Sequence, residues 1–197
     1  MLVAAAAAAV ISSSRPNPAP GVPDGTAPTP WQTFVNQSMR FSLRYPIFWR
    51  ASPARFQSEF VAGIVFLSTE HVPTPCHTSH DRRSVACVIA PVRLDDGDVY
   101  ILWAASSVLP KPRETALDRA SGRPTTIDGH RAKVDVTGPA QRRWCQQSDG
   151  ARIVEVSIAQ GMHELIQMDA CLAGSPQQLA ALTQIVLRSA RSVRLGS

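Results

Sequence analysis

The sequence lacks the short motifs by which the commonest enzyme classes are recognised. It has no Gly-x-Ser-x-Gly, the sharp turn that presents a hydrolase nucleophile, and neither a Gly-x-Gly-x-x-Gly dinucleotide fingerprint nor a P-loop. It also has no Cys-x-x-Cys, which argues against a thioredoxin-like redox site and against a zinc ribbon. These absences favour a protein that acts by binding, so we expect no enzyme activity and no cofactor.

The sequence contains very little lysine and no internal repeats. Lys111 and Lys133 are the only lysines, so the net charge of +5 comes from arginine. GC-rich coding explains an arginine bias as readily as a selected basic surface does, and we therefore expect no nucleic-acid partner. No segment of about 20 to 50 residues repeats. Hydrophobic residues make up 44% and charged residues 18% of the 197 residues, and this composition predicts one globular domain.

The amino-terminal part of the chain is of low complexity. Leu2–Ile11 is an alanine-dominated apolar run with the length of a signal-peptide h-region, too short to span a bilayer, although no positively charged segment precedes it. We interpret residues 1–14 as a signal-peptide-like segment and expect an exported protein. Residues 15–30 contain six prolines and predict an extended, disordered tether. The folded domain is expected over residues 31–197. A disordered alanine-rich tail on a cytosolic protein is the alternative.

Four cysteines fall into two local pairs. Cys76 is followed by Cys87, and Cys145 by Cys171, and three pairings are conceivable. If the compartment is oxidising, two structural disulfides, one within each local pair, account for them best.

A predicted hairpin indicates that Cys145 and Cys171 are bonded to each other. Ile153–Ile158 and His163–Cys171 are expected to pair about a turn centred on Gly161, which places Cys171 opposite Ala151. A short excursion through residues 146–150 would then bring the sulfur of Cys145 within bonding distance. The bond is expected to hold this hairpin to the rest of the sheet.

A zinc site is the alternative for the first pair of cysteines. Cys76, His77, His80 and Cys87 offer the atoms of a tetrahedral site, but their spacing is that of no known finger or ribbon. A disulfide that closes a loop with two solvated histidines explains the same residues. We therefore expect no metal there.

Other polar side chains have simple structural interpretations. Asp95, Asp96 and Asp98 could be offered as calcium ligands, but they lack the later acidic ligand of an EF-hand loop, and a hairpin turn accounts for them. This turn would join strands at 85–92 and 99–108. The isolated histidines are expected to lie on the surface or in hydrogen bonds rather than to act as catalytic bases. They are His71, His130 and His163.

The stretch that begins at Phe41 predicts a half-buried strand followed by an apolar cluster. Its apolar residues alternate with polar ones, so one face of the strand covers the core. They are Phe41, Leu43 and Tyr45. Pro46 cannot donate to a ladder and ends the strand. The Ile-Phe-Trp cluster at 47–49 is expected to turn back against the element that packs on the sheet.

The remaining chain predicts further strands and two helices. Residues 31–35 and 39–45 form a first hairpin, 60–67 a central strand, and 52–58 a connection. Asp128-Gly129 is a turn into a strand whose inward residues are Ala132, Val134 and Val136. A short helix is expected over 114–120. A long closing helix begins at the capping box of Ser175–Gln178 and buries residues spaced by three and four along the chain up to Val193.

These elements predict an α+β protein, an antiparallel β-sheet with helices packed on it. A strand that ends in Tyr-Pro and continues into an aromatic cluster, together with the later Asp-Gly turn, resembles PsbP-like domains. These include actinobacterial secreted proteins and lipoproteins of the LpqN type. The resemblance covers about residues 31–195 and implies an α/β/α sandwich and an accessory role in the cell envelope. No cysteine follows the apolar run of residues 2–11, so this chain departs from the lipoproteins and should not be acylated there.

Arginines suggest one surface that could bind a ligand. Arg188, Arg191 and Arg194 recur at the end of the closing helix, and Arg142 and Arg143 could extend the same patch. Such a patch suits an anionic envelope lipid or polymer. A solvated helix face that complements the helix dipole is the simpler interpretation.

We therefore expect an exported, non-enzymatic binding or accessory factor of the cell envelope. An extracellular sensor module for a small or lipidic ligand is an alternative, favoured if an apolar cavity with a few converging polar groups lies beside the sheet. An envelope hydrolase of unrecognised type is the other, favoured if His, Asp and Ser side chains meet within hydrogen-bond reach.

Overall fold

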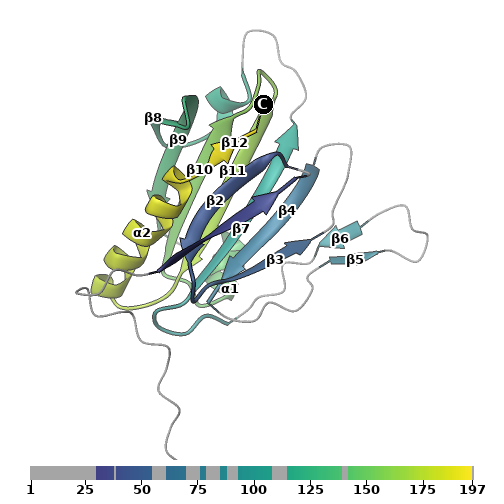
Figure 1. Cartoon of the computed structure of the whole chain (residues 1–197). Coiled ribbons are helices and arrows are strands. Elements are labelled where there is room, and N and C mark those ends of the chain that lie inside the picture. Colours follow the sequence, from purple (N-terminus) through teal and green to yellow (C-terminus); the bar gives the residue numbers. More distant parts are fainter. Residues whose placement is uncertain are drawn as a thin grey trace, which may run out of the picture.

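The computed structural model describes residues 30–37, 39–54, 61–69, 76–78, 85–87, 93–107, 115–138 and 142–196. In this part of the chain the largest element is a seven-stranded antiparallel sheet, in the order β3-β4-β7-β11-β10-β9-β8 (Figure 1). Its strands are β3 (Arg50–Ala54), β4 (Val61–Ser68), β7 (Val99–Ser107), β8 (Arg123–Ile127), β9 (His130–Thr137), β10 (Arg152–Ala159) and β11 (Glu164–Leu172).

Two smaller sheets accompany the large one. The strands β1 (Trp31–Asn36) and β2 (Phe41–Pro46) form the predicted first hairpin, and β12 (Arg194–Leu195) pairs with β2. The strands β5 (Cys76–Thr78) and β6 (Val85–Cys87) form a separate two-stranded ribbon. The backbone of Cys76 lies directly opposite that of Cys87 in this ribbon.

The closing helix α2 (Pro176–Arg191) begins as the sequence predicts. The Ser175 hydroxyl accepts a hydrogen bond from the Gln178 N–H, and the Gln178 side-chain oxygen accepts one from the Ser175 N–H at 2.8 Å. These two bonds satisfy amides that the first turn of a helix leaves without partners. Its buried side chains are Leu179, Leu182, Thr183, Val186, Ser189 and Ala190. The helix ends before Arg194, so the predicted run of helical arginines stops at Arg191.

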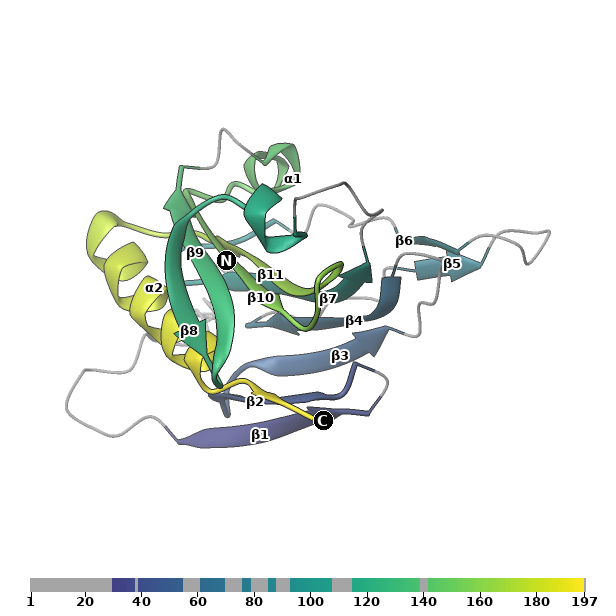
Figure 2. The same cartoon turned by 90° about the horizontal axis from the view of Figure 1, so that it is seen from above.

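The main core lies between the large sheet and a layer made of α2 and the small β1-β2-β12 sheet. It joins Trp103 and Met168 of the large sheet to Phe41 of β2 and Val186 of α2. Figure 1 shows α2 and the small sheet over the same face of the large sheet. The opposite face carries a short helix, α1 (Arg143–Gln147), and a 3₁₀ turn, η1 (Leu117–Arg119) (Figure 2). The architecture is therefore α+β with antiparallel sheets, as the sequence predicts.

The hairpin of β8 and β9 closes the far edge of the large sheet. Asp128 and Gly129 have φ values of 50° and 78°, and the two positive values indicate the type I′ turn that suits a right-twisted hairpin. The predicted turn is confirmed, and so is the burial of Ala132. The burial of Val136 is not, because this side chain is 43% exposed beside α2.

Other local predictions are corrected. The strand β7 pairs with β4 and β11, so the turn at Asp95–Asp98 does not join the 85–92 and 99–108 segments in a hairpin. The helix expected over 114–120 is the single 3₁₀ turn η1, and α1 was not predicted. The connection expected at 52–58 begins with the last residues of β3, whereas the strand expected at 60–67 is β4, an interior strand that pairs with β3 and β7.

The apolar cluster after β2 does not pack as a unit. Trp49 is buried in the main core, whereas Ile47 is 56% exposed and Phe48 38% exposed. The predicted return of all three residues against the sheet is therefore wrong for two of them. Among the described residues, the longest apolar helix still falls short of what a bilayer crossing requires.

Candidate functional site

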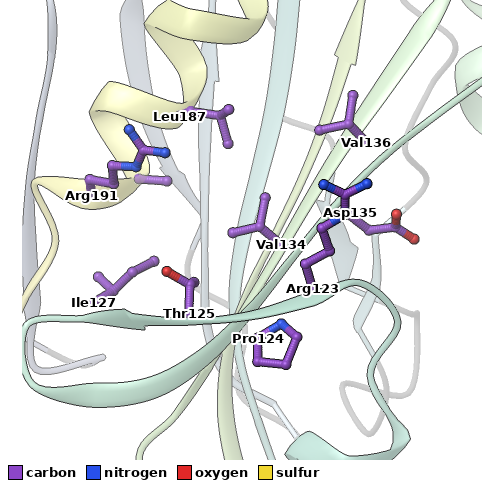
Figure 3. Close-up of a pocket in the computed structure, with 10 residues that line it drawn as sticks. Arg123, Pro124, Thr125, Ile127, Val134, Asp135, Val136, Leu187 and Arg191 are labelled. Atoms are coloured by element: carbon purple, nitrogen blue, oxygen red, sulfur yellow. The ribbon is translucent and has the colours of Figure 1, made fainter.

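A pocket of about 480 Å³ lies between α2 and the edge hairpin of β8 and β9. The side chains of Ile127, Val134 and Val136 come from the hairpin, and those of Leu187 and Ala190 from the helix (Figure 3). The pocket exists because β8 and β9 extend beyond the part of the sheet that α2 covers closely. This explains why Val134 is half-buried and Val136 is exposed. The size is within the usual range for small-molecule sites.

Two arginines enter this pocket from different elements. Arg191 comes from the last turn of α2, and Arg123 is the first residue of β8. Figure 3 shows them on either side of Val134. Neither guanidinium has a hydrogen bond or an ion pair with a described residue. Asp135 is also a lining residue, but strand alternation places its side chain on the opposite face from Val134 and Val136, and it forms no ion pair with either arginine. Two positive groups without described partners, at a pocket whose lining is polar in one part and aliphatic in another, favour a ligand that is anionic at one end and apolar at the other.

The predicted arginine patch is divided by the sheet. Arg188, Arg191 and Arg194 lie on the α2 side, and Arg194 pairs with Asp128 at 3.6 Å. Arg142 and Arg143 are at α1 on the opposite face, where Arg142 is hydrogen-bonded to Glu155. A single patch of five arginines is therefore not formed. The sequence also gave no weight to Arg123, because only the folded hairpin brings it opposite Arg191.

Carboxylates form a row on the α1 face of the sheet. Glu155 in β10 lies opposite Asp169 in β11 and also opposite Asp135 in β9. Burial, with the nearby charge of Glu155 as the smaller cause, raises the pKa of Asp169 to about 6, and the charge of Arg142 opposes both. The side-chain oxygen of Glu155 accepts the hydrogen bond from Arg142. This row was not predicted, because strand register alone determines which carboxylates become neighbours.

The disulfide Cys145–Cys171 is present, with a Cα–Cα distance of 5.5 Å. Cys171 pairs with Ile153 rather than with Ala151, so the predicted register is off by two residues. An even shift leaves Cys171 on the predicted face, which is why the pairing still holds. The bond attaches α1 to β11. The hairpin itself is held by hydrogen bonds to β7 and β9, so the expected role of the bond was wrong.

Several predicted features fall where the structure gives no side chains. The side chains of Cys76, His77 and Cys87, and the whole of His71 and His80, lie outside the described residues, so the first disulfide and the absence of zinc stay predictions. Within the described ranges no three His, Cys, Asp or Glu side chains are grouped to hold a metal ion.

Of the three aspartates at positions 95–98, Asp98 has a structural role. One carboxylate oxygen of Asp98 accepts the Asp95 N–H at 2.9 Å, and the other accepts the Thr69 hydroxyl at 2.8 Å. These bonds fix the turn that leads into β7.

No hydrolytic triad assembles in the described part of the chain. His130 contacts the Ala159 carbonyl oxygen through Nδ1 at 3.1 Å, and the buried Nδ1 of His163 has no hydrogen-bond partner. Neither ring meets a serine hydroxyl or a carboxylate there. The described histidines therefore give the hydrolase alternative no support.

Comparison with known proteins adds a similarity of fold. No protein-family model matches the chain, and no curated protein matches it. The solution structure of cyanobacterial PsbP (CyanoP) from Synechocystis sp. PCC 6803 is similar over 89% of this chain and 98% of that chain. The sequence identity is 10% and the TM-score 0.46. At this TM-score the similarity supports no statement about membership of a family or about function.

Proposed function

We propose that this protein is a non-enzymatic binding protein that holds a small amphipathic anion in the pocket between α2 and the β8–β9 hairpin. The observation that carries the proposal is the entry of Arg123 and Arg191, both without described partners, into a cavity of about 480 Å³. A carboxylate or phosphate group would lie between the two guanidinium groups. The apolar part of the ligand would lie on Val134 and Leu187.

The pocket has a positively charged part and an aliphatic part, and each would bind the matching part of an amphipathic anion. Guanidinium groups bind carboxylate and phosphate oxygens through charge-assisted hydrogen bonds, which are stronger than bonds between neutral groups. The aliphatic lining contributes through the burial of apolar surface. Because Arg191 is held on a helix and Arg123 on a strand of a hairpin, both positive groups are attached to regular elements.

Octyl phosphate and octanol test this proposal directly. We expect the protein to bind octyl phosphate measurably more tightly than octanol in isothermal titration calorimetry, because only the phosphate engages the arginines. Arg123→Gln and Arg191→Gln should each weaken octyl phosphate binding by roughly 10-fold, as expected for the loss of one charge-assisted contact.

Arg143→Gln is the matched control for these variants. Arg143 is also exposed, but it lies at α1 on the other face of the sheet, so its replacement should leave the affinity unchanged. Equal loss of affinity in all three variants would indicate a general charge effect. Binding of octyl phosphate that none of the three variants alters would exclude this pocket.

The same proposal includes export. The disulfide Cys145–Cys171 supports an oxidising compartment, and the apolar run of residues 2–11 suits a signal peptide. Protein recovered from the culture medium should begin between about Ser12 and Thr29 when its amino terminus is sequenced. Recovery from the cytosol alone, with Met1 intact, would contradict export.

The finer family assignment belongs to this proposal as well. The Tyr-Pro strand end at Tyr45-Pro46 and the Asp128-Gly129 turn support a PsbP-like α/β/α sandwich of the LpqN type. In that case the protein would act as an accessory factor of the cell envelope, and an envelope protein is a further partner to consider. Crosslinking of the mature protein in its own envelope would recover such a partner.

A further inference from the structure

The turn between β2 and β3 presents two apolar side chains that the rest of the described chain leaves partly exposed to solvent. Ile47 is 56% exposed and Phe48 is 38% exposed. The turn itself is well held, because the Ile47 N–H donates to the Pro30 carbonyl and the Trp49 N–H to the Pro46 carbonyl, each at 3.0 Å. The exposure of these two side chains is therefore a feature of a fixed backbone.

The elements around this turn carry positive charge alone. Residues 31–54, which form β1 to β3, and residues 175–197, which contain α2 and β12, include no aspartate or glutamate. Their charged residues are Arg40, Arg44, Arg50, Arg188, Arg191 and Arg194. One carboxylate from outside these elements, Asp128 of the β8–β9 turn, pairs with Arg194 at the far end of β2. The charge near the exposed turn is not balanced in this way by any described carboxylate.

The fold brings arginines from distant parts of the chain to the same place. The Arg188 guanidinium lies 4.8 Å from the ring centre of Trp31, and Trp31 is paired with Pro46 at the start of the turn. The Arg44 N–H donates to the Ser192 hydroxyl at 2.7 Å, which joins β2 to the end of α2. In Figure 1 the start of β1 and the β2–β3 connection lie at the same end of the small sheet. We call Ile47, Phe48, Arg44, Arg50 and Arg188 the basic-apolar tip.

We propose that the basic-apolar tip docks on a membrane surface that contains anionic lipids. Exposed aliphatic and aromatic side chains can enter the boundary between headgroups and acyl chains, and guanidinium groups beside them attract lipid phosphates. A soluble polyanion would bind the arginines but would not bury the apolar side chains of Ile47 and Phe48. The tip therefore fits a lipid surface better. Pro30, the first described residue of the chain, is also at the tip, because its carbonyl oxygen accepts the hydrogen bond from the Ile47 N–H. This docking does not depend on the pocket.

Vesicle sedimentation with the full chain tests the docking. We expect the protein to bind vesicles of equal parts phosphatidylcholine and phosphatidylglycerol, to bind pure phosphatidylcholine poorly, and to be released by salt. The Ile47→Ser, Phe48→Ser double variant and the Arg44→Gln, Arg188→Gln double variant should each bind the mixed vesicles roughly 10-fold more weakly or worse.

Every variant retains the low-complexity amino terminus, so any vesicle binding by that segment is the same in the tip variants and in their controls. Met162→Ser removes an apolar side chain that is 67% exposed in the β10–β11 turn, and Arg143→Gln removes an exposed arginine on the opposite face. Both should bind like the parent. The changed side chains of the tip are on the surface, so thermal melting should show that its variants stay folded.

Three outcomes would overturn the proposal. The first is an absence of binding to the mixed vesicles, and the second is equal binding by the tip variants and their controls. The third is binding to soluble polyphosphate that depends on Arg44 and Arg188 and is as strong as vesicle binding, with no effect of Ile47→Ser, Phe48→Ser on either. That result would mean that the arginines bind a soluble polyanion rather than a membrane surface.

Discussion

The Cys145→Ser, Cys171→Ser variant is expected to melt well below the parent protein. The bond links residues that are 26 apart in sequence, and chain entropy predicts that closing such a loop stabilises the fold by about 3–4 kcal/mol. Both sulfurs are completely buried, so the two serine hydroxyls would also have to find hydrogen-bond partners in an apolar cluster. For a domain of this size, the loss corresponds to a melting temperature lower by about 10 °C.

The contacts around the disulfide show why α1 depends on it. The helix has five residues and no side-chain cap at its amino end, so it is too short to be stable without tertiary contacts. Its Trp144 packs edge-on against Tyr100, with 5.9 Å between the ring centres. Gly150 approaches the bond so closely that a Cβ there would overlap both sulfur atoms. Loss of the bond should therefore release α1 before it affects the sheet, which hydrogen exchange of the α1 amides would detect.

The Cys76→Ser, Cys87→Ser variant is the control for this measurement. The strands that carry these cysteines pair with each other and with no strand of the large sheet. Their predicted bond closes a shorter loop, so its removal should lower the melting temperature less. Equal melting of the parent and of the Cys145→Ser, Cys171→Ser variant would contradict the stabilising role. Peptide mapping that joined Cys145 to Cys76 or Cys87 would contradict the pairing.

The elements that sequence predicted well are those with a local cause. The capping box at Ser175 acts within one helical turn, and the Asp128-Gly129 turn needs positive φ values that few residue pairs adopt readily. The alternation of Phe41, Leu43 and Tyr45 likewise reports a single strand with one buried face, and all three side chains are buried. In each case the physical reason lies within a few residues of the element.

The elements that sequence missed depend on tertiary contacts. The sequence predicted a connection over residues 52–58, yet β3 extends to Ala54 as an edge strand, where the N–H donor that Pro53 lacks is not required. The helix α1 has only five residues and no side-chain cap at its amino end, and a disulfide and an aromatic contact hold it in place. Ile47 and Phe48 looked like core residues because apolar sequence alone does not distinguish a buried turn from an exposed one.

The candidate site was predictable only in part, for a related reason. Arg191 was singled out because it follows Arg188 along a helix, but Arg123 lies 68 positions earlier in the chain and joins the pocket through the β8–β9 hairpin. Likewise, the neighbours Glu155 and Asp169 are set by the register of β10 and β11. Periodicity in the sequence predicts on which face of a helix or strand a residue lies. To predict a site, one must also know which elements are adjacent in the fold.

Asp169→Asn is expected to stabilise the protein near pH 7.5 and to change how its stability depends on pH. Burial, with the charge of Glu155 as the smaller cause, raises the pKa of Asp169 from 3.8 to about 6 in the folded protein. The folded state therefore holds this proton more tightly than the unfolded state does. Between about pH 4 and pH 6 the unfolded chain has already lost the proton that the folded chain retains, so stability falls as the pH rises through this window.

The size of this effect follows from the shift in pKa. A difference of about two units corresponds to roughly 3 kcal/mol over the whole titration, of which the parent loses about 2 kcal/mol between pH 4.5 and pH 7.5 and the asparagine variant loses none. Urea denaturation of both proteins at pH 4.5 and pH 7.5 measures it, because the other titrating groups cancel in the comparison. Asp96→Asn, at an exposed turn, is the control and should follow the parent at both values. A difference between parent and Asp169→Asn that is the same at pH 4.5 and pH 7.5 would show that Asp169 does not titrate in this window.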